Sequence, residues 1–277
     1  MLMNVVLWLT FASAAGLSTP PGAWQQRVHR GAARLRRIQE LQLSPATLTA
    51  SESRELQGLL NRGDPYNATE HSAQHRQFKA AHNRIFATLA ASAGGSAGAP
   101  AFYLDGADGA TTEVLLAAGF DTEQLYTTNL FHDTCATLRE DHGLQHVCLG
   151  SAEQELSCPP LCTTPFVAYY LDGCSGQVAP LVEMVRAVFH ERRVDVNPAR
   201  LVLGFTLTRA EPTGRSLGDR ELDVLRAIAA GCRARGYLPP SHPLEEPAVW
   251  GLEEDAGKQE GGTLTTWVVC ERAAKRS

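Results

Sequence analysis

The stretch FYLDGADGATTEVLLAAGF, residues Phe102 to Phe120, decides the fold of this chain. It predicts a short apolar strand, then an acidic loop with two glycines, then a helix that opens at Thr111–Thr112. A carboxylate and the free N–H groups of a helix N-terminus therefore meet at the carboxyl end of a strand. Open α/β sheets bind nucleotide-like ligands at this edge.

The loop between that strand and that helix is the first candidate binding site. Gly106 and Gly109 lack a Cβ, so the backbone can approach a ligand closely there. Asp105 offers two acceptor oxygens to amino or hydroxyl donors. A tight strand-to-helix turn without a ligand is the alternative interpretation, and the sequence leaves it open.

Strands and helices alternate downstream of this loop, which predicts an α/β fold. We expect strands at Phe102–Leu104, Gln124–Thr128, Gln145–Leu149, Phe166–Leu171 and Arg200–Leu207, and helices at Thr112–Ala118, Asp133–Asp141, Ala179–Glu191 and Asp219–Arg235. Two further strand-like segments, Pro247–Leu252 and Thr263–Glu271, are joined by polar residues that end in Gly-Gly, which predicts a hairpin and an antiparallel last strand. The sequence thus predicts a Rossmann-like, doubly wound sheet, mostly parallel, over residues 101–277.

Residues 41–100 are expected to form helices followed by a linker. Thr49-Ala-Ser-Glu52 has the spacing of a capping box, so a helix should start there and run to about Asn61. A second helix is expected from about Ala68 to Ala91, and the Gly, Ala and Ser residues that follow it are typical of a flexible linker.

One face of this second helix carries His71, His75 and His82. No local carboxylate completes a metal site, so the pattern indicates a half-exposed helix face. If the helix covers a ligand cleft, His82 and Asn83 would touch the substrate.

Residues 1–40 have the composition of a targeting presequence. Val5 to Ala15 is apolar, too short to span a bilayer, and ends in small residues like a signal cleavage site. Trp24 to Gln39 is rich in arginine and free of acids, as transit peptides are. The two features in series resemble the two-part presequences of plastid proteins in algae with complex plastids. We therefore expect an organelle, a plastid rather than a mitochondrion, with the secretory pathway and a buried or frayed N-terminal helix as alternatives.

The charge distribution argues against a nucleic-acid partner. The net charge of −5 combines +5 from the residues before Glu40 with −10 from the rest of the chain. So acidic a body lacks the broad basic footprint of a nucleic-acid binder, and a small-molecule or protein partner is expected instead. No segment after the presequence reaches transmembrane length, so we expect no membrane association of the mature form. The sequence leaves the oligomeric state open.

The seven cysteines show no paired spacing, which indicates a reduced compartment. Cys158-Pro-Pro-Leu-Cys162 is a CxxxC, whereas a zinc ribbon or a thioredoxin site needs CxxC. We expect no bound metal.

The order of these elements resembles the class I S-adenosylmethionine-dependent methyltransferases, whose seven-stranded sheet ends with an antiparallel strand from a terminal hairpin. The resemblance covers roughly Ala101 to Glu271 and rests on the order and position of the elements. It implies S-adenosylmethionine as the cofactor, with Asp105, Gly106 and Gly109 around its methionine part. The glycine pattern of the family is incomplete here, since Ala107 and Thr111 stand where glycines are usual.

The ends of the later strands supply the other residues that the resemblance implies. Asn129 stands where an acid normally binds both ribose hydroxyls, and an amide makes uncharged hydrogen bonds. Ser151 to Glu153 would contact the adenine. Asp172, after the fourth strand, is the implied catalytic residue, either as a base or as a group that orients the nucleophile. A solvated acid or a helix cap is the alternative role for Asp172.

Other enzyme classes fit less well. The segment 172–176 also resembles the strand-four motif of RNA 5-methylcytosine methyltransferases, but Phe205-Thr-Leu-Thr208 lacks their nucleophilic cysteine, so we reject that chemistry. The Asn/Asp-Pro-Pro-aromatic motif of amino-group methyltransferases is absent, which leaves the acceptor atom undetermined. A nicotinamide site needs GxGxxG, whereas the loop at Gly106 and Gly109 offers only GxxG. A haloacid-dehalogenase-like phosphatase needs a second acid two residues after the first, whereas Asp108 is three residues after Asp105.

The sequence therefore predicts methyl transfer from S-adenosylmethionine to an unidentified acceptor. The incomplete glycine loop and Asn129 support a second hypothesis, a methyltransferase-like binding module that no longer catalyses.

Overall fold

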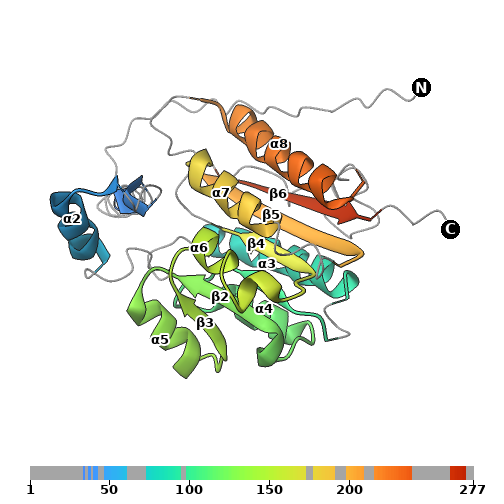
Figure 1. The fold of residues 1–277 in the computed structure, drawn as a ribbon. Coiled ribbons are helices and arrows are strands. Elements are labelled where there is room, and N and C mark those ends of the chain that lie inside the picture. The colour runs from blue at the N-terminus through green and yellow to red at the C-terminus, as the bar shows by residue number, and fades with distance from the viewer. Residues whose placement is uncertain are drawn as a thin grey trace, which may run out of the picture.

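A six-stranded sheet forms the centre of the computed structural model (Figure 1). The structure describes residues 34, 37, 38, 40–42, 47–60, 73–94, 98–172, 177–190, 198–208, 215–238 and 263–272. The strands are β1 Ala101–Tyr103, β2 Leu125–Asn129, β3 His146–Leu149, β4 Ala168–Leu171, β5 Arg200–Thr208 and β6 Thr263–Glu271. Their order in the sheet is β3-β2-β1-β4-β5-β6. All the predicted strands that fall within the described residues are therefore present.

The direction of the strands confirms the predicted fold class. β1 to β5 pair in parallel with their neighbours. β6 runs antiparallel to β5, with Arg200 opposite Glu271 at one end and Thr208 opposite Thr263 at the other. This is a Rossmann-like, doubly wound arrangement with six described strands. The other arm of the predicted hairpin, Pro247–Leu252, lies outside the described residues.

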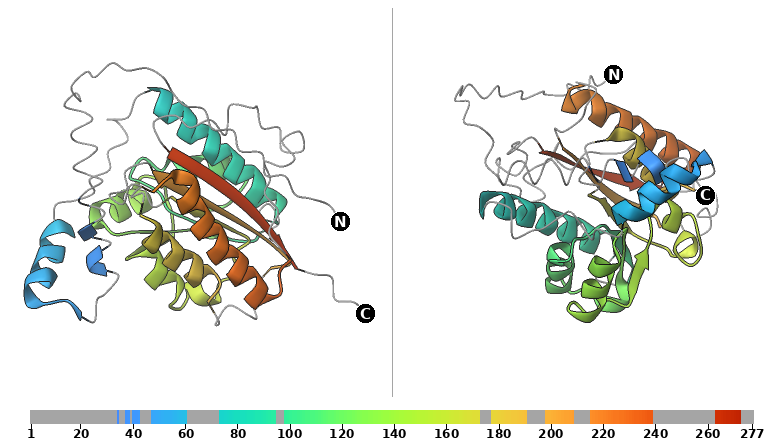
Figure 2. Two further views of the ribbon diagram at one scale, coloured as in Figure 1. Left: turned by 90° about the horizontal axis from the view of Figure 1, so that it is seen from above. Right: turned by 90° about the vertical axis from the view of Figure 1, so that its left-hand side faces the viewer.

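Helices cover both faces of the sheet (Figures 1 and 2). The α-helices are α2 Ala50–Leu60, α3 Ala73–Ser92, α4 Ala110–Ala117, α5 His132–Glu140, α6 Ala152–Leu156, α7 Val178–Val188 and α8 Leu217–Arg235, and two short 3-10 helices are η4 Thr122–Gln124 and η5 Leu161–Thr163. Buried side chains of α3, α4 and α5 share one core with the sheet, and those of α6, α7 and α8 share the other.

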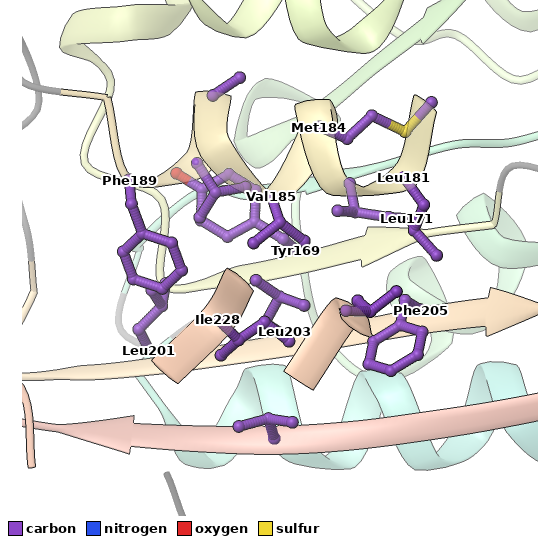
Figure 3. Close-up of a cluster of buried hydrophobic side chains, with 14 of the residues drawn as sticks. Tyr169, Leu171, Leu181, Met184, Val185, Phe189, Leu201, Leu203, Phe205 and Ile228 are labelled. Atoms are coloured by element: carbon purple, nitrogen blue, oxygen red, sulfur yellow. The ribbon is translucent and has the colours of Figure 1, made fainter. Parts of the chain in front are cut away.

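The core under α7 and α8 is built from aliphatic and aromatic side chains of β4 and β5 (Figure 3). Val185 of α7 and Ile228 of α8 are both fully buried there, beside Leu203 of β5. The unbroken apolar run of β4 fits its central position, because helices cover it on both faces.

On the opposite face, α3 packs directly on the sheet. The ring of Phe86 lies 5.9 Å from that of Trp267 and 5.3 Å from that of Tyr170, measured between centroids. Trp267 in turn lies on Gly204, where an added Cβ would come within 2.0 Å of the indole. α3 is therefore part of the core of the sheet. The domain bounds at residues 41–100 and 101–277 stay a prediction.

The capping box predicted at Thr49 is present at the start of α2. The Thr49 N–H donates to Glu52 Oε2 at 2.9 Å, and the Glu52 N–H donates to Thr49 Oγ1 at 3.2 Å. This reciprocal pair satisfies two of the N–H groups that a helix start leaves without an intrahelical partner. Within the described part of the chain, no helix is both long enough and apolar enough to cross a membrane.

Candidate functional site

The loop after β1 makes a tight turn into α4. The Gly109 N–H donates to the Gly106 carbonyl at 3.0 Å, and Gly109 then adopts φ 57° and ψ 23° as the N-cap of α4. That left-handed conformation favours glycine. A Cβ on Gly109 would also lie 2.3 Å from the His142 ring. The left-handed conformation and the closeness of His142 both explain why glycine is needed at this position. The hydrogen bond to Gly106 keeps the backbone of the loop close to the start of α4.

Asp105 holds this turn together from inside. Its side chain is 6% exposed, and its Oδ2 accepts hydrogen bonds from the Thr112 N–H at 2.9 Å and the Thr112 hydroxyl at 2.8 Å. Its Oδ1 accepts from the N–H groups of Gly106 at 3.0 Å and Thr111 at 3.4 Å. The carboxylate therefore occupies free N–H groups at the N-terminus of α4, where a negative charge is also favoured by the helix dipole.

Two opposing influences act on the protonation of Asp105. Burial raises the pKa of this carboxyl above its ordinary value, while the charge of Lys79 on α3 and the hydrogen bonds from Thr112 act in the opposite direction. Lys79 therefore lies close enough to the β1 loop for its charge to influence Asp105. Nothing in the sequence pattern indicates this proximity, because it depends on how α3 packs.

Asn129 at the end of β2 ties the second loop to the first. Its Nδ2 donates to the Asp105 carbonyl at 3.1 Å, and its Oδ1 accepts from the Phe131 N–H at 2.9 Å. The side chain thus joins the ends of β1 and β2. An acid at this position has no N–H group and could not donate to the Asp105 carbonyl. One amide hydrogen and one lone pair remain for a ligand.

The third loop follows β3 and leads into α6. The Thr128 hydroxyl donates to the Gly150 carbonyl at 2.8 Å and so attaches this loop to β2. α6 is a short helix that the sequence analysis missed, since five residues are too few to show a helical period. Ser151 is its N-cap residue, but its side chain makes no capping hydrogen bond.

Several buried polar atoms at these loops have no hydrogen-bond partner among the described residues. They are Asp108 Oδ1, Thr111 Oγ1, Ser151 Oγ and Glu153 Oε2. Buried polar groups in proteins are nearly always paired, so a ligand or water that binds here would find these four atoms open among the described residues. Asp108 and Ser151 lie on the loops after β1 and β3, and Thr111 and Glu153 lie in the first turns of α4 and α6 that follow them. The described residues contain no group of three or more metal-ligating side chains.

All six residues predicted from the sequence follow parallel strands at one edge of the sheet. Asp105, Gly106 and Gly109 follow β1, Asn129 ends β2, Glu153 follows β3 and Asp172 follows β4. The Asn129–Asp105 hydrogen bond joins two of these residues directly. Asp172 is half-buried directly after β4, and residues 173–176 beyond it lie outside the described residues. Their roles as ligands and catalyst stay predictions.

The predicted half-exposed face around the histidines of α3 is wrong at His82 and Asn83. His82 is 4% exposed and Asn83 is fully buried, so this part of the helix is covered rather than half-exposed. His82 Nδ1 lies 3.3 Å from the Thr265 hydroxyl, and both amide atoms of Asn83 have no partner among the described residues. His71 and the side chain of His75 lie outside the described residues.

The sequence analysis also missed Asp108 and Thr111 as candidate ligands. Ala107 and Thr111 were considered only as departures from a glycine pattern. Polar side chains beside a glycine-containing loop and a helix N-terminus are themselves a signal of a binding site. Asp108 and Thr111 both have such a position.

No family model matches this chain. No curated protein matches it. Among solved structures, it is similar to the plantazolicin methyltransferase BamL in complex with a triazolic desmethylPZN analog and SAH, with a TM-score of 0.49, 7% identity, and coverage of 90% of this chain and 99% of that one. It is similar to the Methanococcus jannaschii fibrillarin pre-rRNA processing protein, with a TM-score of 0.40, 12% identity, and coverage of 63% and 68%. It is also similar to a putative sarcosine dimethylglycine methyltransferase from Galdieria sulphuraria, with a TM-score of 0.40, 13% identity, and coverage of 69% and 85%. The fold assignment therefore rests on strand order and direction.

Proposed function

We propose that this chain binds S-adenosylmethionine at the carboxyl edge of its sheet and transfers the methyl group to a small-molecule or protein acceptor. The observation that carries the proposal is a set of buried atoms without a partner among the described residues, on the loops after β1 and β3 and in the first turns of the helices that follow. They are Asp108 Oδ1, Thr111 Oγ1, Ser151 Oγ and Glu153 Oε2. In the class I S-adenosylmethionine-dependent methyltransferases, which the order of elements resembles, these loops face the methionine and adenine ends of the cofactor.

The residues present fit such a ligand when their hydrogen bonds are considered. The Asp105 carboxylate is engaged with α4, so it shapes the loop, and the Asp108 Oδ1 atom is the acceptor left for an ammonium group. Asn129 has one amide hydrogen left for a ribose hydroxyl, and Glu153 has one oxygen left for the adenine amino group.

The cofactor supplies an electrophilic methyl group on a positively charged sulfur. Asp172 is the described carboxylate placed directly after β4, beside the central loop of the site. There it would accept a proton from the acceptor or hold the nucleophile in line with the methyl group. The acidic body of the chain favours a small-molecule or protein acceptor over a nucleic acid.

A second candidate function is a binding module without catalysis. The engagement of Asn129 with the Asp105 carbonyl and the Phe131 N–H favours it, because the ribose then loses the charged partner that an acid would supply. Such a module would bind the cofactor weakly or not at all.

Calorimetric titration of S-adenosylhomocysteine into the full chain and into Asp108→Asn tests the proposal. We expect saturable one-site binding to the wild type and at least about tenfold weaker binding to the variant, which is the loss of one charge-assisted hydrogen bond. Glu123→Gln is the matched control, since this exposed acid lies directly before β2, at the opposite edge of the sheet. No binding by a folded wild-type chain would support the module without cofactor.

A further inference from the structure

Two apolar side chains among the first helical residues of the described chain are buried, although the composition there predicts a targeting segment. Residues 34, 37, 38 and 40–42 are helical, and we call this segment the strap. Ile38 is fully buried and Leu41 is 3% exposed. Chain ends without a structural role are normally exposed, so this burial indicates that the strap packs as part of the folded protein.

Two side chains of the strap contact two different loops at the carboxyl edge of the sheet. The Arg34 guanidinium lies 5.4 Å from the centroid of the Phe131 ring, within the range of a cation–π contact. At the other end, Gln177 Nε2 donates to Glu40 Oε1 at 3.3 Å. Phe131 follows β2, and Gln177 lies between β4 and α7.

These contacts place the strap across the end of β1. β1 lies between β2 and β4 in the sheet, so the loop that starts at Asp105 lies between Phe131 and Gln177. Two strand spacings measure about 9.5 Å. Glu40 stands six positions after Arg34, and six positions correspond to a rise of about 9 Å at the α-helical rise per residue, which matches that span.

The figures agree with this position. In the right-hand view of Figure 2, the first blue segment and α2 lie in front of the strand ends, between α8 and the helices of the opposite face. Arg37 also attaches the strap to α2, because its guanidinium donates to both carboxylate oxygens of Glu55, at 2.9 and 2.8 Å. The strap and α2 therefore meet at the edge where the β1 loop ends.

We propose that the strap forms the outer wall of the ligand site, with Arg34 on Phe131 and the buried Ile38 holding it over the β1 loop. This inference rests on the proposed function for the identity of the ligand. It also bears on targeting, since a presequence that ended at residue 40 would take most of the strap with it. If a presequence is removed, the proposed wall requires its cleavage site to lie before Arg34.

Two variants of the full chain test the wall. Arg34→Ala removes the contact with Phe131, and Ile38→Asp places a charge in a fully buried position. We expect both to weaken S-adenosylhomocysteine binding by at least about tenfold in calorimetry and to speed its release in stopped-flow displacement, because an enclosed ligand loses one side of its site. Arg54→Ala is the matched control, since this exposed arginine on α2 donates to its own helix at Ala50.

Hydrogen exchange of the chain without ligand gives a second readout. In both variants we expect at least about tenfold faster exchange of the amides at 105–112, with α8 unchanged as the control for folding. Unchanged affinity and exchange in both variants would overturn the inference, and so would faster exchange with unchanged affinity. If the wild type binds no cofactor while the exchange result holds, the proposed function fails and the covering of the loop stands.

Discussion

Replacing Asp105 by asparagine should destabilise the protein, because the carboxylate holds the start of α4. Its two oxygens accept four hydrogen bonds, from Gly106, Thr111 and Thr112. An asparagine keeps one acceptor oxygen and turns an NH2 group toward the other pair of donors, so two bonds are lost. Each bond to a charged group is worth about 1.5–3 kcal/mol. Burial raises the pKa of Asp105, because desolvation disfavours the charged carboxylate. This cost offsets part of the free energy that the two hydrogen bonds contribute, so the expected net loss is about 2 kcal/mol.

Thermal unfolding at pH 7, followed by circular dichroism, measures this loss. A change of about 2 kcal/mol corresponds to a Tm lower by about 4–8 °C for a domain of this size. Asp141→Asn, at an exposed position, should stay within about 0.5 kcal/mol of the wild type. A Tm of Asp105→Asn within about 1 °C of the wild type would refute the capping role. If cofactor affinity were lost at the same time, Asp105 would be a direct ligand, as the sequence analysis expected.

Three further variants probe the sheet, α2 and α8. Gly204→Ala places a Cβ within 2.0 Å of the Trp267 indole and should lower the free energy of unfolding by about 1–3 kcal/mol. Gly58→Ala, where nothing lies near the added Cβ in α2, should raise helix stability by about 0.5–1 kcal/mol. Chemical denaturation measures both changes. Burial raises the pKa of Glu221, so its contribution to stability is full below its ordinary pKa of about 4.3 and is lost as the pH rises through the folded-state pKa. Glu221→Gln should therefore gain stability relative to the wild type as the pH rises above about 4.3, and parallel stability profiles would contradict the buried carboxyl.

The order of strands and helices was predictable because each element carries its own periodic pattern. The capping box at Thr49, the apolar run of β4 and the antiparallel direction of β6 all depend on residues close in sequence or on one hairpin. The position of the candidate site followed from topology alone, since parallel strands bring their carboxyl ends to one edge.

The partners of individual side chains were not predictable in this way. The engagement of Asn129 with the Asp105 carbonyl joins residues 24 positions apart, and the effect of Lys79 on Asp105 depends on the packing of α3. Local residue type suggested a ligand role for Asp105, but the donors that surround it come from Gly106 in its own loop and from Thr111 and Thr112 of α4.

The strap shows two sequence signals in competition. Arg34, Ile38 and Leu41 recur at helical spacing, which indicates one buried face. Arg34 and Ile38 also belong to the arginine-rich segment without acids, Trp24 to Gln39, which suggested a transit peptide. Composition cannot separate these interpretations, whereas the burial of Ile38 and the contact with Phe131 favour a folded segment.

The most direct test of the central claim is a calorimetric titration of S-adenosylhomocysteine into the full wild-type chain, with circular dichroism to verify that the protein is folded. The proposed site predicts saturable binding of one ligand per chain. Absence of binding by the folded chain would contradict it, and the polar atoms at the carboxyl edge of the sheet would then require another ligand.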